Sequence, residues 1–305
     1  MPTRVPGAKP QPPPRALPVP KQALPAVPPP GNLIMPVSEV RPGMKGYGLT
    51  VFRGTTIERF EVDILGVLPK TNMGQSLVLV KLSGGPISKR GAYLIQGMSG
   101  SPIYVNGKLL GAFSMGNAWP KEPQGMVTPI EDMLEALDPK LSEVPAGQTA
   151  YDLSPLDATG GEQDAATPGG GLFRTPAEQD AAPLTGQGIR PLALPVTVSG
   201  LTGARLQRLA QVLRPFNMSV MEGPSSSGLP PFKAELTPGA AIGVSLMTGD
   251  IDITSIGTVT YRKGDQLLAF GHPMMQIGAA QFPITTAFIH DVFSGFQVSH
   301  KIGSA

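Results

Sequence analysis

The residues QGMSGSPIY at positions 96–104 place a serine between two glycines, in a context that favours a tight loop. Gly97 and Gly100 can adopt backbone angles that most other residues resist, so a sharp turn is expected on both sides of Ser99. Pro102 has no N–H and cannot continue a helix, so the chain is expected to leave this loop in an extended form. The pattern predicts that Ser99 lies on a short loop that enters a β-strand.

The residues after this loop have the pattern of a β-hairpin. Two apolar runs, 103–105 and 108–113, are separated by Asn106-Gly107, and Asn-Gly between apolar runs is the strongest short-range hairpin signal. Ser99 is therefore expected on a loop that a rigid hairpin supports, with backbone N–H groups beside it.

A serine presented in this way suits acyl transfer. Such a reaction needs an accessible hydroxyl and two N–H groups directed at the oxyanion, here those of Gly97 and Ser99. The other interpretation of the same residues is a Gly/Ser turn between two strands that has no chemical role, because short motifs are only hypotheses.

The motif resembles the nucleophile loop of a known peptidase family. Residues 97–102, the hairpin and the run FSMG at 113–116 are similar to the nucleophile loop, hairpin and substrate-binding strand of chymotrypsin-like serine peptidases. They resemble most closely the SpoIVB (sporulation stage IV B) serine peptidases, whose loop reads Gly-Met-Ser-Gly-Ser-Pro-Ile. Residues 127–134 resemble the segment that closes that family's domain. The resemblance implies a serine endopeptidase that acts on a protein or peptide substrate.

The strand after the hairpin is a candidate substrate-binding edge. Ser114 and Gly116 are expected to bind the substrate backbone by β-strand addition. An ordinary strand end is the alternative for both residues.

A second chemical motif is Gly271-His272-Pro273, which follows a predicted strand at 266–270. A histidine held at a strand end suits a general base, since its unperturbed pKa lies near neutrality. The SpoIVB family carries its base after a Gly-Thr-x-Thr strand and a Gly-His pair, which resemble residues 257–260 and 271–272 here. Taken alone, such a histidine is more often structural. Together with Ser99, it is interpreted as the catalytic base.

The order of these two motifs differs from that of the family, in which the histidine precedes the serine. Catalytic triads are defined by geometry and not by chain order, so the inverted order does not forbid catalysis. It requires residues 32–137 and 192–305 to pack together, with the active site between them.

The acid of a catalytic triad is the least certain member. The family has its triad acid about fifteen residues before the serine, but residues 82–85 of this chain include no carboxylate. A different acid directly precedes the serine of trypsin-like enzymes, and Met98 replaces it here. Asp291 is a weak candidate to orient the imidazole, and a solvated loop acid is the alternative. A Ser–His dyad of reduced rate is a further interpretation.

Many short strands separated by Gly/Pro turns predict a mainly β protein with two β-barrel-like halves of the chymotrypsin type and a few short helices. A Pro-rich disordered tail (1–31), with twelve prolines and no acid, precedes a serine-bearing β domain (32–140). A flexible Gly/Ala/Pro-rich linker (141–190) then leads to a histidine-bearing β-rich domain (191–305), which is expected to be cut short. Helices are predicted after Pro129 and over 201–213.

Composition excludes several classes of function. The chain has no cysteine, so disulfides and thiolate catalysis are excluded. Its net charge of +2 and the lack of a basic stripe argue against a nucleic-acid partner. His290 and His300 have no metal-ligand spacing, so no metal is expected, and no cofactor motif is present.

Targeting signals are also absent from the sequence. No apolar run of 18 residues is present, so no membrane-spanning segment is expected, and no signal peptide is recognised. The residues leave the compartment open, while the resemblance implies an extracytoplasmic location.

The sequence therefore predicts a SpoIVB-type serine endopeptidase that uses Ser99 as nucleophile and His272 as base. Two alternatives remain: a peptidase-like interaction module without turnover, and a Pro-tailed scaffold protein.

Overall fold

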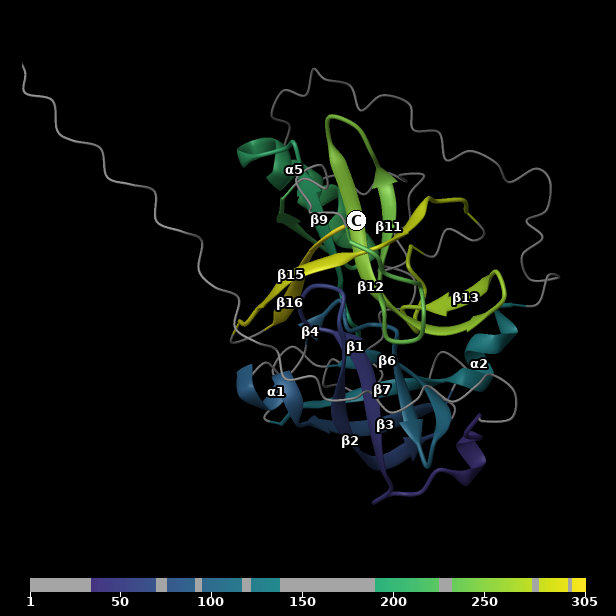
Figure 1. The fold of residues 1–305 in the computed structure, drawn as a ribbon. Coiled ribbons are helices and arrows are strands. Elements are labelled where there is room, and N and C mark those ends of the chain that lie inside the picture. The colour runs from purple at the N-terminus through teal and green to yellow at the C-terminus, as the bar shows by residue number, and fades with distance from the viewer. Residues whose placement is uncertain are drawn as a thin grey trace, which may run out of the picture.

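The computed structural model describes residues 34–69, 76–90, 95–116, 122–137, 190–224, 232–275, 280–295 and 298–305. These residues form two β-rich halves. The serine-bearing half lies in the lower part of Figure 1 and the histidine-bearing half lies above it. The predicted tail, nearly all of the predicted linker, and Trp119 lie outside the described residues.

The serine-bearing half is built on a closed six-stranded barrel. Its strands are β1 (Lys45–Val51), β2 (Ile57–Leu68), β3 (Leu77–Ser83), β5 (Ser101–Val105), β6 (Lys108–Gly116) and β7 (Gln124–Pro129). They follow the order β5-β1-β2-β3-β7-β6, and antiparallel pairing of β5 with β6 closes the ring. Register shifts in β2–β3, β5–β6 and β6–β7 supply the bends that closure requires.

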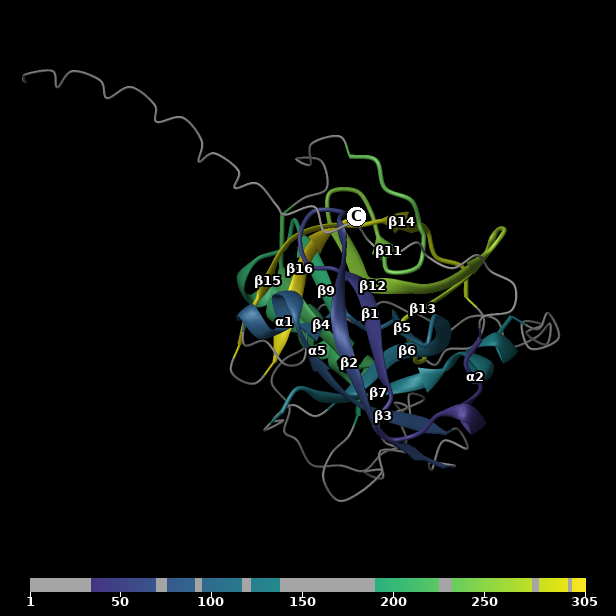
Figure 2. The same cartoon turned by 60° about the horizontal axis from the view of Figure 1, so that its bottom comes forward.

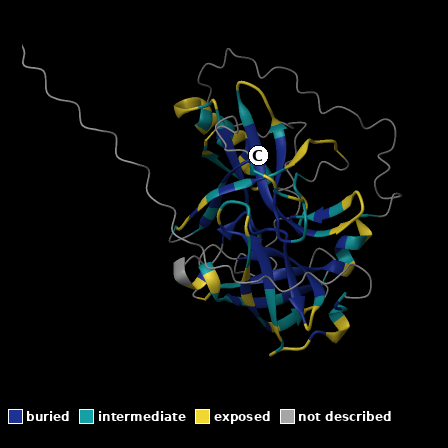
Figure 3. Cartoon of the chain, in the orientation of Figure 1, coloured by how far each residue is buried: buried dark blue, intermediate teal, exposed yellow. Residues whose placement is uncertain are grey.

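The expected hairpin joins β5 to β6. Asn106 and Gly107 have φ values of 52° and 77°, and positive φ at both central residues is the type I′ geometry that suits the twist of two strands. The 3-10 helix η1 (Val37–Glu39), helix α1 (Gly85–Arg90) and helix α2 (Ile130–Glu135) complete this half. The apolar side chains of its strands fill the barrel, where the dark blue of buried residues is densest in Figure 3.

The histidine-bearing half is a second sheet, in which β12 (Asp252–Lys263) is the central strand. The order is β10-β9-β12-β11-β14, and β13 (Gln266–Ala269) pairs with β12. The other strands are β9 (Leu194–Ser199), β10 (Met218–Glu222), β11 (Ala241–Met247) and β14 (Ile284–Thr286). Helix α5 (Gly203–Leu213) and the 3-10 helix η2 (Arg214–Phe216) connect β9 to β10, which run parallel and so need a crossover.

A third sheet joins the two halves. It consists of β15 (Phe288–Phe293), β16 (Ser299–Ser304) and β4 (Ile95–Gln96), in the order β15-β16-β4. β4 immediately precedes the serine loop, and it pairs in parallel with β16 near the far end of the chain. The turned view in Figure 2 again places β15 and β16 next to β4. The loop that carries Ser99 is therefore anchored to both halves.

The structure confirms the mainly β fold and the barrel that the sequence predicts. The boundaries between domains stay a prediction. No helix among the described residues is long and apolar enough to cross a membrane.

Candidate active site

Ser99 lies on the turn between β4 and β5, and its two flanking glycines have the backbone angles that the sequence predicts. Gly97 has φ 90° and Gly100 has φ 92°, values that an L-residue with a side chain rarely adopts. The turn is closed by bonds from the Met98 N–H to the Ile95 carbonyl (3.0 Å) and from the Ser101 N–H to the Met98 carbonyl (2.9 Å).

The histidine-bearing half holds this turn through β12. The Thr258 N–H donates to the Ser99 carbonyl (2.9 Å), and the Thr258 hydroxyl donates to the Gly97 carbonyl (2.9 Å). The Thr260 hydroxyl donates to the Gly100 carbonyl (2.7 Å). Two threonines of one strand thus hold three carbonyls of the serine turn.

His272 follows β13 through a strained backbone turn. Phe270 has φ 66° and Gly271 has φ 74°, and positive φ at a phenylalanine is unusual enough to indicate a constrained position. A β-carbon at Gly271 would lie 2.7 Å from Cβ of Ala112 and 3.1 Å from Cβ of Ser114. Glycine at this position lets the histidine loop pack directly on β6.

These two turns bring the predicted nucleophile and base together. Ser99 Oγ lies 2.8 Å from His272 Nε2, although 173 residues separate them. His272 Nδ1 lies 3.0 Å from the carbonyl of Pro273. Because a carbonyl only accepts hydrogen bonds, Nδ1 must carry the proton in the neutral ring, which leaves Nε2 to accept from the serine hydroxyl.

Burial lowers the pKa of His272 below its ordinary value, and the bond to the Pro273 carbonyl partly opposes this. The imidazole is therefore neutral at neutral pH, as a general base must be. Ser99 itself is fully buried and His272 is partly buried.

Residues 32–134 match the family model described as SpoIVB peptidase S55. This confirms, over that segment, the resemblance inferred from the sequence. The S55 segment contains the serine turn and the barrel, while His272 lies outside it. Searches of curated proteins and of solved structures found no match.

The serine turn carries several backbone N–H groups. Those of Met98, Gly100 and Ser101 donate to backbone carbonyls. The N–H groups of Gly97 and Ser99 are the two that the sequence predicts to bind an oxyanion.

The acid position of the site differs from that of a triad. The Nδ1 partner of His272 is a backbone carbonyl, and one carboxylate oxygen of Asp291 accepts from the Val292 N–H (2.8 Å). Among the described residues, the hydrogen-bond partners of the His272 ring are therefore Ser99 and the Pro273 carbonyl, and neither is a carboxylate.

The predicted substrate edge of the serine-bearing barrel is paired with the chain itself. The Leu192 N–H donates to the Ser114 carbonyl (2.9 Å), and β8 (Arg190–Pro191) pairs antiparallel with Met115 and Gly116. Ser114 Oγ is buried and lies 2.7 Å from Thr128 Oγ1. Backbone groups of Ser114 and Gly116 thus already bind an extended segment.

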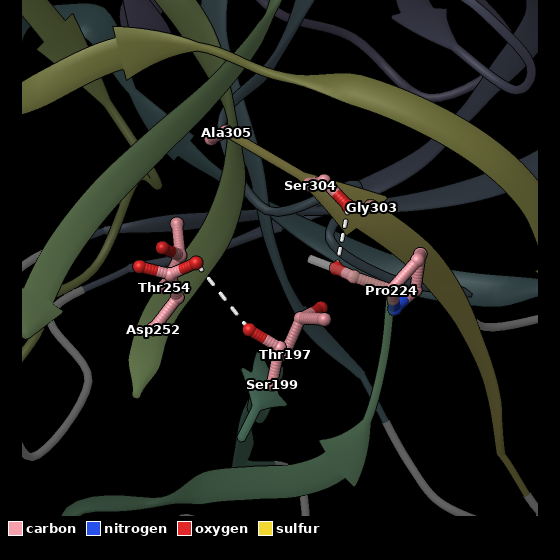
Figure 4. A pocket seen from close by; sticks show the side chains of 8 residues that line it. All are labelled: Thr197, Ser199, Pro224, Asp252, Thr254, Gly303, Ser304 and Ala305. Carbon is pink, nitrogen blue, oxygen red and sulfur yellow. Dashed lines mark hydrogen bonds between the residues drawn. The ribbon is translucent and has the colours of Figure 1, made fainter. Parts of the chain in front are cut away.

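Other polar groups lie outside this arrangement. His290 Nε2 bonds to Ser304 Oγ (3.0 Å), and the His300 ring stacks on Phe293. The described residues contain no group of three or more potential metal-binding side chains. A small hollow between β9, β12 and the end of β16 is lined by neither Ser99 nor His272 (Figure 4). There Ser199 donates to Asp252, and Ser304 donates to the Pro224 carbonyl.

Two features of the site are not predicted from the sequence. Thr258 and Thr260 were noted only as part of a motif that precedes the histidine, although their i, i+2 spacing places both side chains on one face of a strand. Lys301 was not considered. It is fully buried, and its stem packs against Gly97.

Proposed function

We propose that the protein is a serine peptidase that hydrolyses a peptide bond through an acyl-enzyme on Ser99. The observation that carries the proposal is the 2.8 Å distance between Ser99 Oγ and His272 Nε2, which is within the range for direct proton transfer. The match of residues 32–134 to a peptidase family supports it.

In the first step Ser99 Oγ attacks the carbonyl carbon of the substrate, and its proton moves to Nε2 of His272. The oxyanion that forms accepts hydrogen bonds from the N–H groups of Gly97 and Ser99. The C–N bond then breaks, and the proton on Nε2 passes to the amine that leaves. A water molecule repeats the sequence on the ester, releases the acid and restores the serine hydroxyl.

In this scheme the Nδ1 partner of His272 is a backbone carbonyl, with no carboxylate of the described residues in its place. The Pro273 carbonyl holds Nδ1–H and so sets the tautomer, but it carries no full negative charge to stabilise the imidazolium. We therefore propose a Ser–His dyad whose rate is lower than that of a complete triad.

Substrate is proposed to bind along β6, at Ser114 and Gly116. The edge begins beside the nucleophile, since the Gly100 N–H donates to the Phe113 carbonyl (2.9 Å). An added peptide must displace Arg190–Leu192, which hold the same backbone groups. Arg190–Leu192 therefore compete with substrate for this edge.

The second candidate is a peptidase-like interaction module without turnover. Three observations favour it. The Nδ1 partner of His272 is a backbone carbonyl and not a carboxylate of the described residues, Ser99 is completely buried, and the edge of β6 is occupied.

Labelling by a small fluorophosphonate separates the two candidates. The peptidase predicts stoichiometric labelling of the parent protein and of Ser38→Ala, a control at an exposed serine of η1. Ser99→Ala is expected to remain unlabelled. Equal labelling of the parent and Ser99→Ala, or none of the parent, would favour the interaction module.

A further inference from the structure

Lys301 is a buried lysine that the proposed reaction does not use. It lies on β16 with no exposed surface, and no ion pair joins it to a carboxylate within the described residues. An ammonium group without a counterion is costly to bury. A lysine retained in such a place is a candidate for a functional role.

The lysine lies directly beside the serine turn. β16 pairs in parallel with β4, so that His300 is opposite Gln96, and Lys301 comes next to Gly97. A β-carbon on Gly97 would lie 3.1 to 3.2 Å from three carbons of the Lys301 stem. The side chain therefore fills the space that a larger residue at position 97 would need.

The Lys301 amino group begins a chain of hydrogen bonds that ends on this turn. Lys301 Nζ donates to Thr50 Oγ1 (2.7 Å) and, at a longer distance, to Thr258 Oγ1 (3.4 Å). The two threonine hydroxyls lie 3.3 Å apart, and Thr258 donates to the Gly97 carbonyl (2.9 Å).

The two ends of this chain fix its direction. The Gly97 carbonyl only accepts, so the single proton of the Thr258 hydroxyl is donated there, and Thr258 Oγ1 accepts from Thr50 and Lys301. Thr50 then donates to Thr258 and accepts from Lys301 Nζ. The Gly97 carbonyl belongs to the peptide unit between the two that carry the Gly97 and Ser99 N–H groups. A fixed carbonyl there restrains both of those N–H groups.

We propose that Lys301 is a positioning residue of the peptidase site. It acts through Thr50 and Thr258 to hold the Gly97 carbonyl in place. The fixed carbonyl keeps the N–H groups of Gly97 and Ser99 directed at the substrate oxyanion. This inference rests on the proposed function. It assigns a role to a residue that is about 200 positions from the serine in sequence and is not part of the Ser–His pair.

The test replaces Lys301 by methionine, which has a similar length and no charge. Loss of a well-placed oxyanion donor lowers rates by about 10² to 10³, so Lys301→Met is expected to slow fluorophosphonate labelling of Ser99 by about 10- to 100-fold. In peptide hydrolysis kcat is expected to fall by a similar factor, with KM nearly unchanged. Lys263→Met, at an exposed lysine of β12, is the matched control and should behave as the parent.

Thr258→Val provides an independent test, because it removes only the hydroxyl that reaches Gly97. Its effect on labelling should resemble that of Lys301→Met, and the double variant should be no slower than the slower single one, since both changes interrupt one chain. Parental labelling rates in both single variants would overturn the positioning role. Failure of the proposed function has a different signature, which is an unlabelled parent protein.

Discussion

The hydroxyl of Thr258 donates a 2.9 Å hydrogen bond to the carbonyl of Gly97. One residue belongs to the strand that leads toward His272, and the other opens the turn that carries Ser99. The position of the serine therefore depends on the histidine-bearing half, and a change at their contact is expected to affect stability and chemistry together.

Gly100→Ala tests this contact from the side of the serine turn. Gly100 has φ 92°, and a β-carbon there would collide with the Thr258 carbonyl and the Phe270 backbone. We expect a loss of about 2 to 4 kcal/mol in the free energy of unfolding, together with loss of labelling. Urea unfolding measures the loss of stability.

Gly107→Ala is the control for backbone strain alone. Gly107 also has a positive φ, but a β-carbon there meets no atom within 4 Å. Equal losses in the two variants would contradict the close contact.

The pH dependence of labelling follows from the lowered pKa of His272. Only the neutral imidazole accepts the serine proton. As the pH is lowered past 6.5, the usual pKa of histidine, the labelling rate should therefore stay high. It should fall only when the pH reaches the lowered pKa of His272. A rate that already halves above pH 6.5 would contradict the burial of the ring.

The same shift affects stability in the acid range. Between the lowered folded pKa and 6.5 the unfolded chain binds more protons than the folded one, so the contribution of His272 to stability is lost as the pH falls through this window. His272→Gln is expected to show a shallower loss of unfolding free energy there than the parent protein. Identical pH profiles of unfolding would contradict the shift.

Lys301 should affect stability at higher pH. Burial lowers its pKa from 10.5 to about 7, so between pH 7 and about 10 the unfolded chain binds the extra proton. The free energy of unfolding of the parent should therefore rise across this range, by about 3 to 5 kcal/mol. Lys301→Met removes this rise, and urea titrations at pH 6.5 and 9.5 compare the two proteins. A parent profile as flat as that of the variant would contradict the burial of an unpaired lysine.

Leu192→Ala tests whether Arg190–Leu192 compete with substrate. Leu192 is 5% exposed and its N–H bonds to Ser114, so its truncation should loosen the segment and lower KM for an extended peptide several-fold. Leu194→Ala is the control, because it removes a comparable buried side chain from β9. The Leu194 N–H donates to the Asn217 carbonyl and not to Ser114. Both variants should lose about 2 to 5 kcal/mol of stability. An unchanged KM in Leu192→Ala, or an equal change in both, would show that substrate does not bind at this edge.

Much of the fold could be predicted from local sequence. The partial alternation of apolar residues over 57–68 and the apolar run at 77–80 predict the strands β2 and β3, and Asn106-Gly107 predicts the hairpin. These signals can be read locally because they depend on neighbouring residues. The residues Ser83-Gly84-Gly85-Pro86 have the composition of a simple turn, but a short helix begins at Gly85. Propensity is a weak guide for such a short element.

The site could be predicted only in part. Ser99 and His272 stand in motifs, so their chemistry was visible, whereas their 2.8 Å contact depends on how two halves pack. Lys301 has no motif, since its role arises only because β16 pairs with β4. Long-range strand pairing of this kind leaves no local signal in a single sequence.

The most direct test of the Ser99–His272 pair is the rate of fluorophosphonate labelling of His272→Ala at pH 7.5, with the adduct located by mass spectrometry. General-base catalysis contributes about 10²- to 10⁴-fold, so labelling of Ser99 should slow by at least 100-fold in this variant while the parent reacts within minutes. Labelling of Ser99 at the same rate in both proteins would show that the imidazole does not activate the serine, and would contradict the account.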